Sequence, residues 1–324
     1  MKYWITYCIL LIVSALLISL GLFAGPTDIS VIEILGGLFE SDEQSISRIV
    51  AWEIRLPRIA TAVVTGSSLG LAGVLIQLST RSSFGDPNLF GVGGGATIFL
   101  ATTAAGIVTL NEFGTFIGCL LSSLVVALIL SRLISNKNLS PVKLAIMGIA
   151  IGALTISIGT SVISHGRVFP TQVIALLAGS FSGNNWEMVF YVVTAFFICF
   201  YISWRMASRF YPIMLGDTLA RSLGVNPIRT RTVAMSITGI LAGASVYSGG
   251  LIGFVGLIAP HITRRLFGNN PQGLILASSL IGAILALGAD QIARLSFAPT
   301  ELPVGMTTTI LGAPVMIYLA SRMK

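Results

Sequence analysis

Long apolar segments constrain this sequence more than any other feature. A transmembrane helix needs about 20 mainly apolar residues, and ten segments reach or approach that length. Charged residues make up only 10% of the 324 residues, too few to cover a water-facing surface. We therefore expect an all-α membrane protein, a tightly packed bundle of ten transmembrane helices that forms one domain over residues 1–324. The expected helices lie near residues 4–24, 59–80, 91–110, 113–133, 141–164, 187–208, 230–250, 252–266, 272–293 and 303–321.

Three of these segments need a separate argument. Residues 4–24 are long for the apolar part of a signal peptide and lack a clear A-x-A cleavage site, so we expect a first transmembrane helix. Residues 91–110 open with the glycine-rich stretch GVGGGAT, and residues 252–266 are short and contain Pro260. The count of ten depends on these last two.

The basic residues orient the chain in the membrane. Cytoplasmic loops carry an excess of Lys and Arg. With a cytoplasmic N-terminus and ten crossings, only Arg48, Arg55, Arg58, Arg167 and Arg294 fall outside, which leaves 14 of the 19 basic residues inside. The net charge of +7 is explained by this asymmetry, because no basic patch interleaved with aromatic residues suggests binding to nucleic acid.

Glycine spacing indicates close helix packing. Small residues four apart let helix backbones approach where water cannot drive association. GSSLGLAGVLIQ (66–77) and GILAGASVYSGG (239–250) also begin alike and would run in opposite directions, so we expect an inverted repeat of helices 2–5 and 7–10. The glycine pairs are in GSSLG (66–70), GVGGG (91–95), GIAIG (148–152), GILAG (239–243) and GGLIG (249–253).

The residue types needed for catalysis or metal binding are scarce. Three cysteines lie in apolar segments without metal-ligand spacing, and the two histidines, His165 and His261, are in unrelated segments. No zinc-protease, nucleophile-elbow or P-loop motif occurs. We therefore expect no enzyme activity, no metal and no cofactor, and any ATP must be hydrolysed elsewhere. In the stretch FVGLIAPHITRRLFG (254–268), Pro260 and His261 are expected to be structural, with His261 donating to nearby backbone.

Carboxylates deep in a membrane helix would indicate a proton or ion pathway. We expect Asp290 and Glu301 instead at the outer surface or at helix ends. This counts against an ion-coupled secondary transporter, which stays the alternative function. An intramembrane enzyme with His261 as base is a further alternative.

The longest inner loop, residues 209–229, contains the stretch LGDTLARSLGV. Leu215, Leu219 and Leu223 are spaced to share a helix face, and Gly224 is placed to end the helix. A short helix that exposes Asp217 and Arg221 would either dock onto a partner or rest on lipid headgroups. On the outer side, the arginines of RLPR (55–58) either anchor at headgroups or pair with carboxylates of another protein.

Six ordered motifs resemble the permease subunits of bacterial ABC importers for ferric siderophores, haem and cobalamin, the FecCD-type family. The resemblance covers roughly residues 48–324, and one departure is GNNPQ (268–272), where the family often has a different turn. The motifs are RLPRIATAVVTGSSLGLAGVLIQ (55–77), DPNLFGVGGGA (86–96), LGDTLARSLGV (215–225), GFVGLIAPHITRRLFG (253–268), ADQIAR (289–294) and ELPVGMTTTILGAPVMIYL (301–319).

The resemblance implies a subunit of a bacterial cell-membrane complex. The implied partners are a second permease subunit, identical or paralogous, two ATP-binding subunits, and an extracytoplasmic substrate-binding protein. The fifth and tenth helices would line the path, with Thr155, Ser157, Thr307, Thr308 and Thr309 available. The other implied roles are coupling to the ATPase for Asp217, Ala220, Arg221 and Gly224, docking of the binding protein for Arg55, Arg58 and Arg294, and an inner gate for Asn138, Leu139 and Ser140. The hypothesis is import of an iron–siderophore complex, haem or cobalamin, and the sequence does not identify which.

Overall fold

A computed structural model describes residues 2–25, 30–40, 44–134, 141–165, 176–298 and 300–321. Its described residues form helices joined by turns and loops, without a strand. Seven helices are long and apolar enough to cross a membrane, so the chain is a multi-pass membrane protein. The long helices are α1 (Lys2–Phe23), α4 (Leu56–Thr80), α6 (Glu112–Ile134), α7 (Pro141–His165), α9 (Trp186–Leu215), α11 (Pro227–Gly249) and α13 (Pro271–Leu295).

Three predicted crossings correspond to shorter helices. These are α5 (Val92–Ala104), α12 (Val255–Phe267) and α14 (Val304–Ser321). Helix length and composition therefore confirm the all-helical membrane class, but neither the count of ten nor the inverted repeat. Both α5 and α12 follow a residue in the left-handed conformation, Gly91 with φ 74° and Phe254 with φ 68°.

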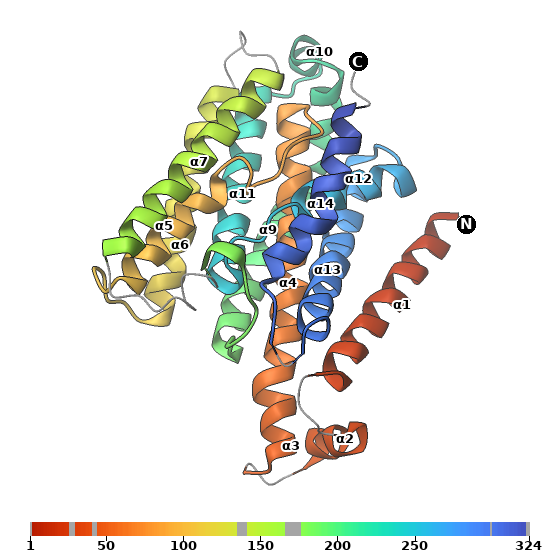
Figure 1. Cartoon of the computed structure of the whole chain (residues 1–324). Coiled ribbons are helices and arrows are strands. Elements are labelled where there is room, and N and C mark those ends of the chain that lie inside the picture. Colours follow the sequence, from red (N-terminus) through yellow and green to blue (C-terminus); the bar gives the residue numbers. More distant parts are fainter. Residues whose placement is uncertain are drawn as a thin grey trace.

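Short helices lie at both ends of the bundle. Helix α10 (Asp217–Ser222) lies at one end, the α10 end, and α2 (Val31–Phe39) and α3 (Ile46–Ile49) lie at the other, the α2 end (Figure 1). Helix α2 was not predicted, although Ser30 and Glu33 have the spacing that marks the start of a helix. The Glu33 amide donates to the Ser30 side chain, and the Ser30 amide donates to Glu33, which is a capping box.

Helix α4 begins earlier than predicted. Helical structure runs without a break from α3 through the π-helical stretch η1 (Val50–Arg55) into α4. Pro57 lacks the N–H that would bond to the carbonyl four residues earlier, and its ring crowds that carbonyl. The widened turn directly precedes Pro57, at the position where it relieves this conflict.

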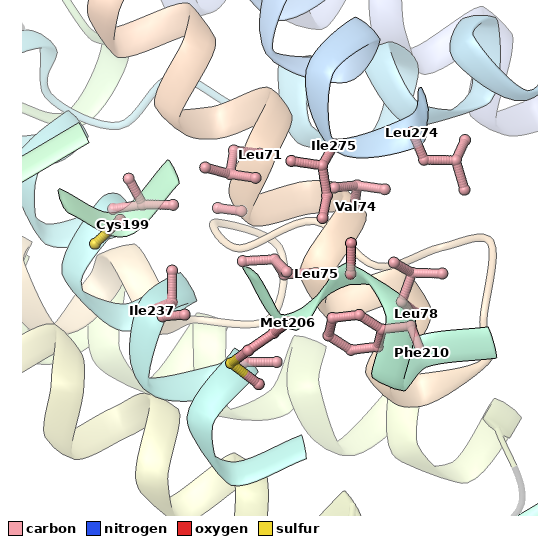
Figure 2. Packing of buried hydrophobic residues seen from close by; sticks show 14 of the residues in the cluster. Leu71, Val74, Leu75, Leu78, Cys199, Met206, Phe210, Ile237, Leu274 and Ile275 are labelled. Carbon is pink, nitrogen blue, oxygen red and sulfur yellow. The ribbon is translucent and has the colours of Figure 1, made fainter. Parts of the chain in front are cut away.

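Helix α4 occupies the centre of the bundle and contacts α9, α11, α12 and α13 (Figure 1). Side chains from four helices form the core beside it. Figure 2 shows Leu71, Val74, Leu75 and Leu78 of α4 packed with residues of α9, α11 and α13, all of them buried.

Glycines, which carry no side chain, let the backbone of α4 approach its neighbouring helices. A Cβ atom on Gly70 would lie 2.1 Å from the Ser278 carbonyl oxygen, and one on Gly73 would lie 1.9 Å from that of Gly256. Gly256 is four residues before Pro260, so its carbonyl is the one that Pro260 leaves without a helical donor. The predicted use of GSSLG for close packing is therefore confirmed at Gly66 and Gly70, both of which meet α13.

Two glycines of α13 give a matched stability test. A Cβ on Gly282 would lie 2.2 Å from the Gly66 carbonyl oxygen, whereas a Cβ on Gly288 would meet nothing within 4 Å. We expect Gly282→Ala to destabilise the fold by about 1–3 kcal/mol through overpacking. Gly288→Ala should be neutral or stabilise it by about 0.5–1 kcal/mol, because alanine favours the helix. Thermal unfolding in detergent measures both, and equal midpoints would contradict the packing argument.

Candidate functional site

The α10 segment projects from the bundle as a separate short helix. Gly216, with φ 128°, ends α9 and starts α10. Gly224 has φ 77°, and its amide donates to the Arg221 carbonyl at 3.0 Å, so the predicted C-cap is confirmed. Leu215 is the last residue of α9, before the break, so the three leucines do not share one helix face as predicted.

Asp217 holds α10 against the bundle. Arg231 of α11 donates to both Asp217 carboxylate oxygens, at 2.9 and 2.8 Å. Arg81, which follows α4, pairs with the same carboxylate. Partial burial would raise the pKa of Asp217, but the hydrogen bonds and charge of Arg231 and the charge of Arg81 outweigh it and hold the pKa below its usual value. Asp217 therefore anchors α10, and because its side chain is still 31% exposed, its contact with an ATPase stays a prediction.

The rest of α10 divides into a buried and an exposed side. Ala220 is fully buried and belongs to the same hydrophobic cluster as Leu71 and Leu75 of α4. Leu219 and Leu223 are 46% and 59% exposed, and Arg221 is also exposed. Leu219 on α10 and Leu223 directly after it therefore form an apolar projection on a segment that Asp217 holds against the bundle.

Four charged side chains form a network at the α2 end. Arg58 of α4 donates to Asp290 of α13 through Nε and Nη2, at 3.1 and 2.8 Å, and to both Glu301 oxygens through Nη1, at 2.9 Å. Arg294 approaches the same Glu301 at 3.9 Å. Asp290 was predicted to lie at the outer surface or at a helix end. The surface position is wrong, because Asp290 is fully buried. A buried carboxylate requires such a partner.

Arg55 and Arg294 bind the end of α1. Arg55 donates to the Leu22 carbonyl at 2.6 Å, and Arg294 donates to the carbonyls of Gly21 and Ala24 at 3.2 and 3.3 Å. These carbonyls lie at a helix C-terminus, where cations are favoured. Arg55, Arg58 and Arg294 are only 2%, 6% and 3% exposed, so a docking role for them stays a prediction.

The loop between α4 and α5, predicted only as part of a family motif, has buried polar residues. Asp86 is fully buried, and its Oδ1 accepts from the amides of Asn88 and Leu89 at 2.9 and 3.0 Å. Its Oδ2 lies against Gly256 in the first turn of α12, where the helix dipole favours negative charge. Asn88 donates to the Ile252 carbonyl at 2.7 Å. The sequence signal that could have predicted this buried polar loop is Asp86-Pro87-Asn88, a polar stretch close to apolar segments.

The remaining predicted residues have separate outcomes. Pro260 is buried within α12, and His261 is partly exposed. The structure gives His261 no hydrogen bond to any residue it describes, so the expected backbone contact is absent there. Asn138, Leu139 and Ser140, the predicted inner gate, lie outside the described residues.

Replacing Asp217 tests the anchor. We expect Asp217→Asn to weaken the attachment of α10 by about 1 kcal/mol, because the lost ion pairs are partly exposed. Amide exchange at residues 219–225 should then become about fivefold faster. Since the Asp217 pKa is lowered on folding, its contribution is complete above about pH 4 and lost as pH falls through the lowered value.

The exposed Arg221→Gln change is the control and should leave this exchange unchanged. After correction for the intrinsic pH dependence of amide exchange, acidification should lower the protection of these amides in the wild type and have no such effect in Asp217→Asn. Identical exchange in Asp217→Asn and the wild type would contradict the anchoring role.

The relatives of this chain among known proteins include permease proteins of import systems. The Fe(3+)-citrate import system permease protein YfmD of Bacillus subtilis is 34% identical over 316 residues, which cover 98% of this chain and 94% of YfmD. The vitamin B12 import system permease protein BtuC of Vibrio cholerae is 33% identical and covers 86% of this chain and 84% of BtuC.

A solved structure extends this likeness to the fold. A metal-chelate type ABC transporter in an inward-facing conformation matches 97% of this chain and 98% of its own, with a TM-score of 0.81 and 27% identity. The model of the FecCD transport family matches residues 10–322. The chain therefore belongs to the FecCD transport family.

Proposed function

We propose that the chain is the permease subunit that moves an iron–siderophore complex, haem or cobalamin into the cytoplasm, powered by separate ATPase subunits. The family consists of transport permease subunits of ABC importers, which work with other subunits and are not enzymes. The proposal that an ATPase docks here is carried by α10, with Leu219 and Leu223 exposed on a helix that Asp217 anchors. Relatives whose names specify Fe(3+)-citrate and vitamin B12 support this substrate class.

Ten crossings and an inverted repeat are part of the proposal. Helix α4 packs against α13 and α12, and α11 packs against α6 and α5. This is the pattern expected if α4–α7 and α11–α14 are related halves whose helices interlock. Helices α5 and α12 then complete crossings that begin as loops inside the bundle, such as residues 81–91. The N-terminus and α10 lie in the cytoplasm in this arrangement.

The proposed path lies along α7 and α14, where a second permease subunit would complete it. Helix α7 contacts mainly α5, and α14 contacts α12 and α13, so each has an uncovered side. Among the five hydroxyl residues expected on this wall, only Ser157 and Thr309 are exposed, and Thr155, Thr307 and Thr308 are buried. An open hollow of about 720 Å³ contains Ser157 and Ser161 amid apolar side chains. A weakly polar wall of this kind would let cargo pass without holding it.

Charge on the α10 leucines tests ATPase docking. We expect Leu219→Glu combined with Leu223→Glu to reduce co-purification of the ATPase by more than about 100-fold, because two carboxylates would be buried in an apolar contact. ATP-driven uptake should fall with it. Leu266→Glu, at a leucine 40% exposed on α12, is the matched control and should retain both.

Full uptake by the double variant would contradict this role of α10. Uphill uptake by the chain reconstituted alone, driven by a pH gradient, would instead favour the ion-coupled alternative.

A bulky residue tests the proposed path. We expect Ser157→Trp to lower uptake by about tenfold or more by narrowing the path, while ATP hydrolysis by the complex continues. Phe197→Trp places the same indole at an exposed site on α9, where a ring is already present, and should leave uptake unchanged. Equal uptake by the two variants would place the path elsewhere.

A further inference from the structure

A polar pocket lies at the α10 end of the bundle, beside the residues that hold α10. It has a volume of about 320 Å³ and is formed by the ends of α4, α9 and α12 with the loops that follow α4 and α12. Among the described residues, no carboxylate lines it. Its polar lining residues are Gln77, Arg81, Ser82, Ser83, Arg264 and Asn269.

Arg264 is held in this pocket by a neutral partner. Its Nη1 donates to Gln77 Oε1, and Gln77 Nε2 donates to the Gly85 carbonyl at 3.2 Å, which fixes the amide group. No carboxylate of a described residue lies within ion-pair distance of Arg264. A guanidinium that is fixed in place without a negative partner is available to bind an anion.

Positive charge exceeds negative charge around the pocket. Arg81 and Arg231 share the single carboxylate of Asp217, and Arg264 adds a third guanidinium without adding a carboxylate. Arg231 Nε is also buried and has no hydrogen-bond partner in the described part of the chain. A bound anion would neutralise part of this excess and would reduce the repulsion among the arginines.

Several donors that face the pocket are free to bind a ligand. Arg81 binds Asp217 through Nη2, and its Nε and Nη1 make no hydrogen bond to a described residue. A guanidinium has five N–H donors, so Arg81 can hold the carboxylate and a second anion together. The exposed side chains of Ser83 and Asn269 add a hydroxyl and an amide, neither bonded to a described residue. Two guanidiniums with a hydroxyl and an amide match an oxyanion with three or more acceptor oxygens.

We propose that this pocket binds a phosphate group between Arg81 and Arg264, and that the bound phosphate ties the ends of α4 and α12 together. Free inorganic phosphate and a phospholipid headgroup both present this oxyanion. Because Arg81 also binds Asp217, the site is connected directly to the anchor of α10. The inference goes beyond the proposed transport function and does not depend on it.

Two probes carry the oxyanion from its two sources, inorganic phosphate and a short-chain phosphatidylglycerol. Each is titrated into the purified full-length chain in a neutral detergent, with chloride holding the ionic strength constant. Phosphorus NMR follows binding. Binding of inorganic phosphate assigns a free anion to the site, and binding of the lipid alone assigns a headgroup. Binding of neither probe would overturn the proposal.

Variants of the lining locate the bound probe. We expect Arg264→Gln to weaken binding by about tenfold or more, because it removes charged hydrogen bonds. Arg265→Gln removes the same charge from an exposed neighbour outside the pocket and should leave binding unchanged. Ser83→Ala keeps every described hydrogen bond, so it does not endanger the fold, and should weaken binding by about threefold.

The bound phosphate should also raise the thermal midpoint of the wild type and not that of Arg264→Gln. Unchanged affinity in both Arg264→Gln and Ser83→Ala would overturn the site, and so would equal weakening by Arg264→Gln and Arg265→Gln, which indicates general attraction.

Co-purification distinguishes a phosphate site from a protein contact. In phosphate-free buffer, Arg264→Gln should retain any ATPase that the wild type binds, as Arg265→Gln should. Loss of the ATPase from Arg264→Gln alone would assign the pocket to a carboxylate of that partner and overturn the phosphate site. A wild type that binds phosphate but no ATPase would support the phosphate site and contradict the proposed function.

Discussion

Water cannot drive helices together inside a bilayer, so the helices of this protein meet where side chains are missing. Gly66, Gly70 and Gly73 bring the backbone of α4 against carbonyls of α13 and α12. Van der Waals contact over such surfaces replaces the hydrophobic effect as the source of cohesion. Because α4 is fixed from several sides, the residues at its two ends have fixed positions too.

Those two ends carry the two ionic clusters. Arg58 lies in the first turn of α4, in the network with Asp290 and Glu301, and Arg81 follows its last turn, paired with Asp217. Arg58 and Arg81 are 23 positions apart in the sequence, which corresponds to roughly 35 Å of helix. The delivery side and the motor side of the proposed transporter are therefore joined by one closely packed helix.

The sequence predicted what depends on local pattern. Each of the ten apolar segments contains a helix, and Gly224 has the backbone conformation that its place after a short helix requires. The sequence did not predict partners from distant segments. The local sequence predicts an exposed Asp217, because Arg81 and Arg231 approach it only in the folded chain. The local sequence likewise predicts that Asp290 lies near a helix end, and its partner Arg58 becomes apparent only in the folded chain. A hydropathy profile depends on which residues are charged, and it does not show which charged side chains pair with each other in the fold.

The loop around Asp86 bears on how the chain is made. Its carboxylate and the neighbouring Asn88 are complemented by α12 and by Ile252, which are synthesised more than 160 residues later. Until that part of the chain inserts, Asp86 has only its local bonds from the Asn88 and Leu89 amides, and the Asn88 side chain lacks its acceptor. The first half therefore completes its polar contacts only when α12 and Ile252 have joined it, so the two halves depend on each other for a fully satisfied interior.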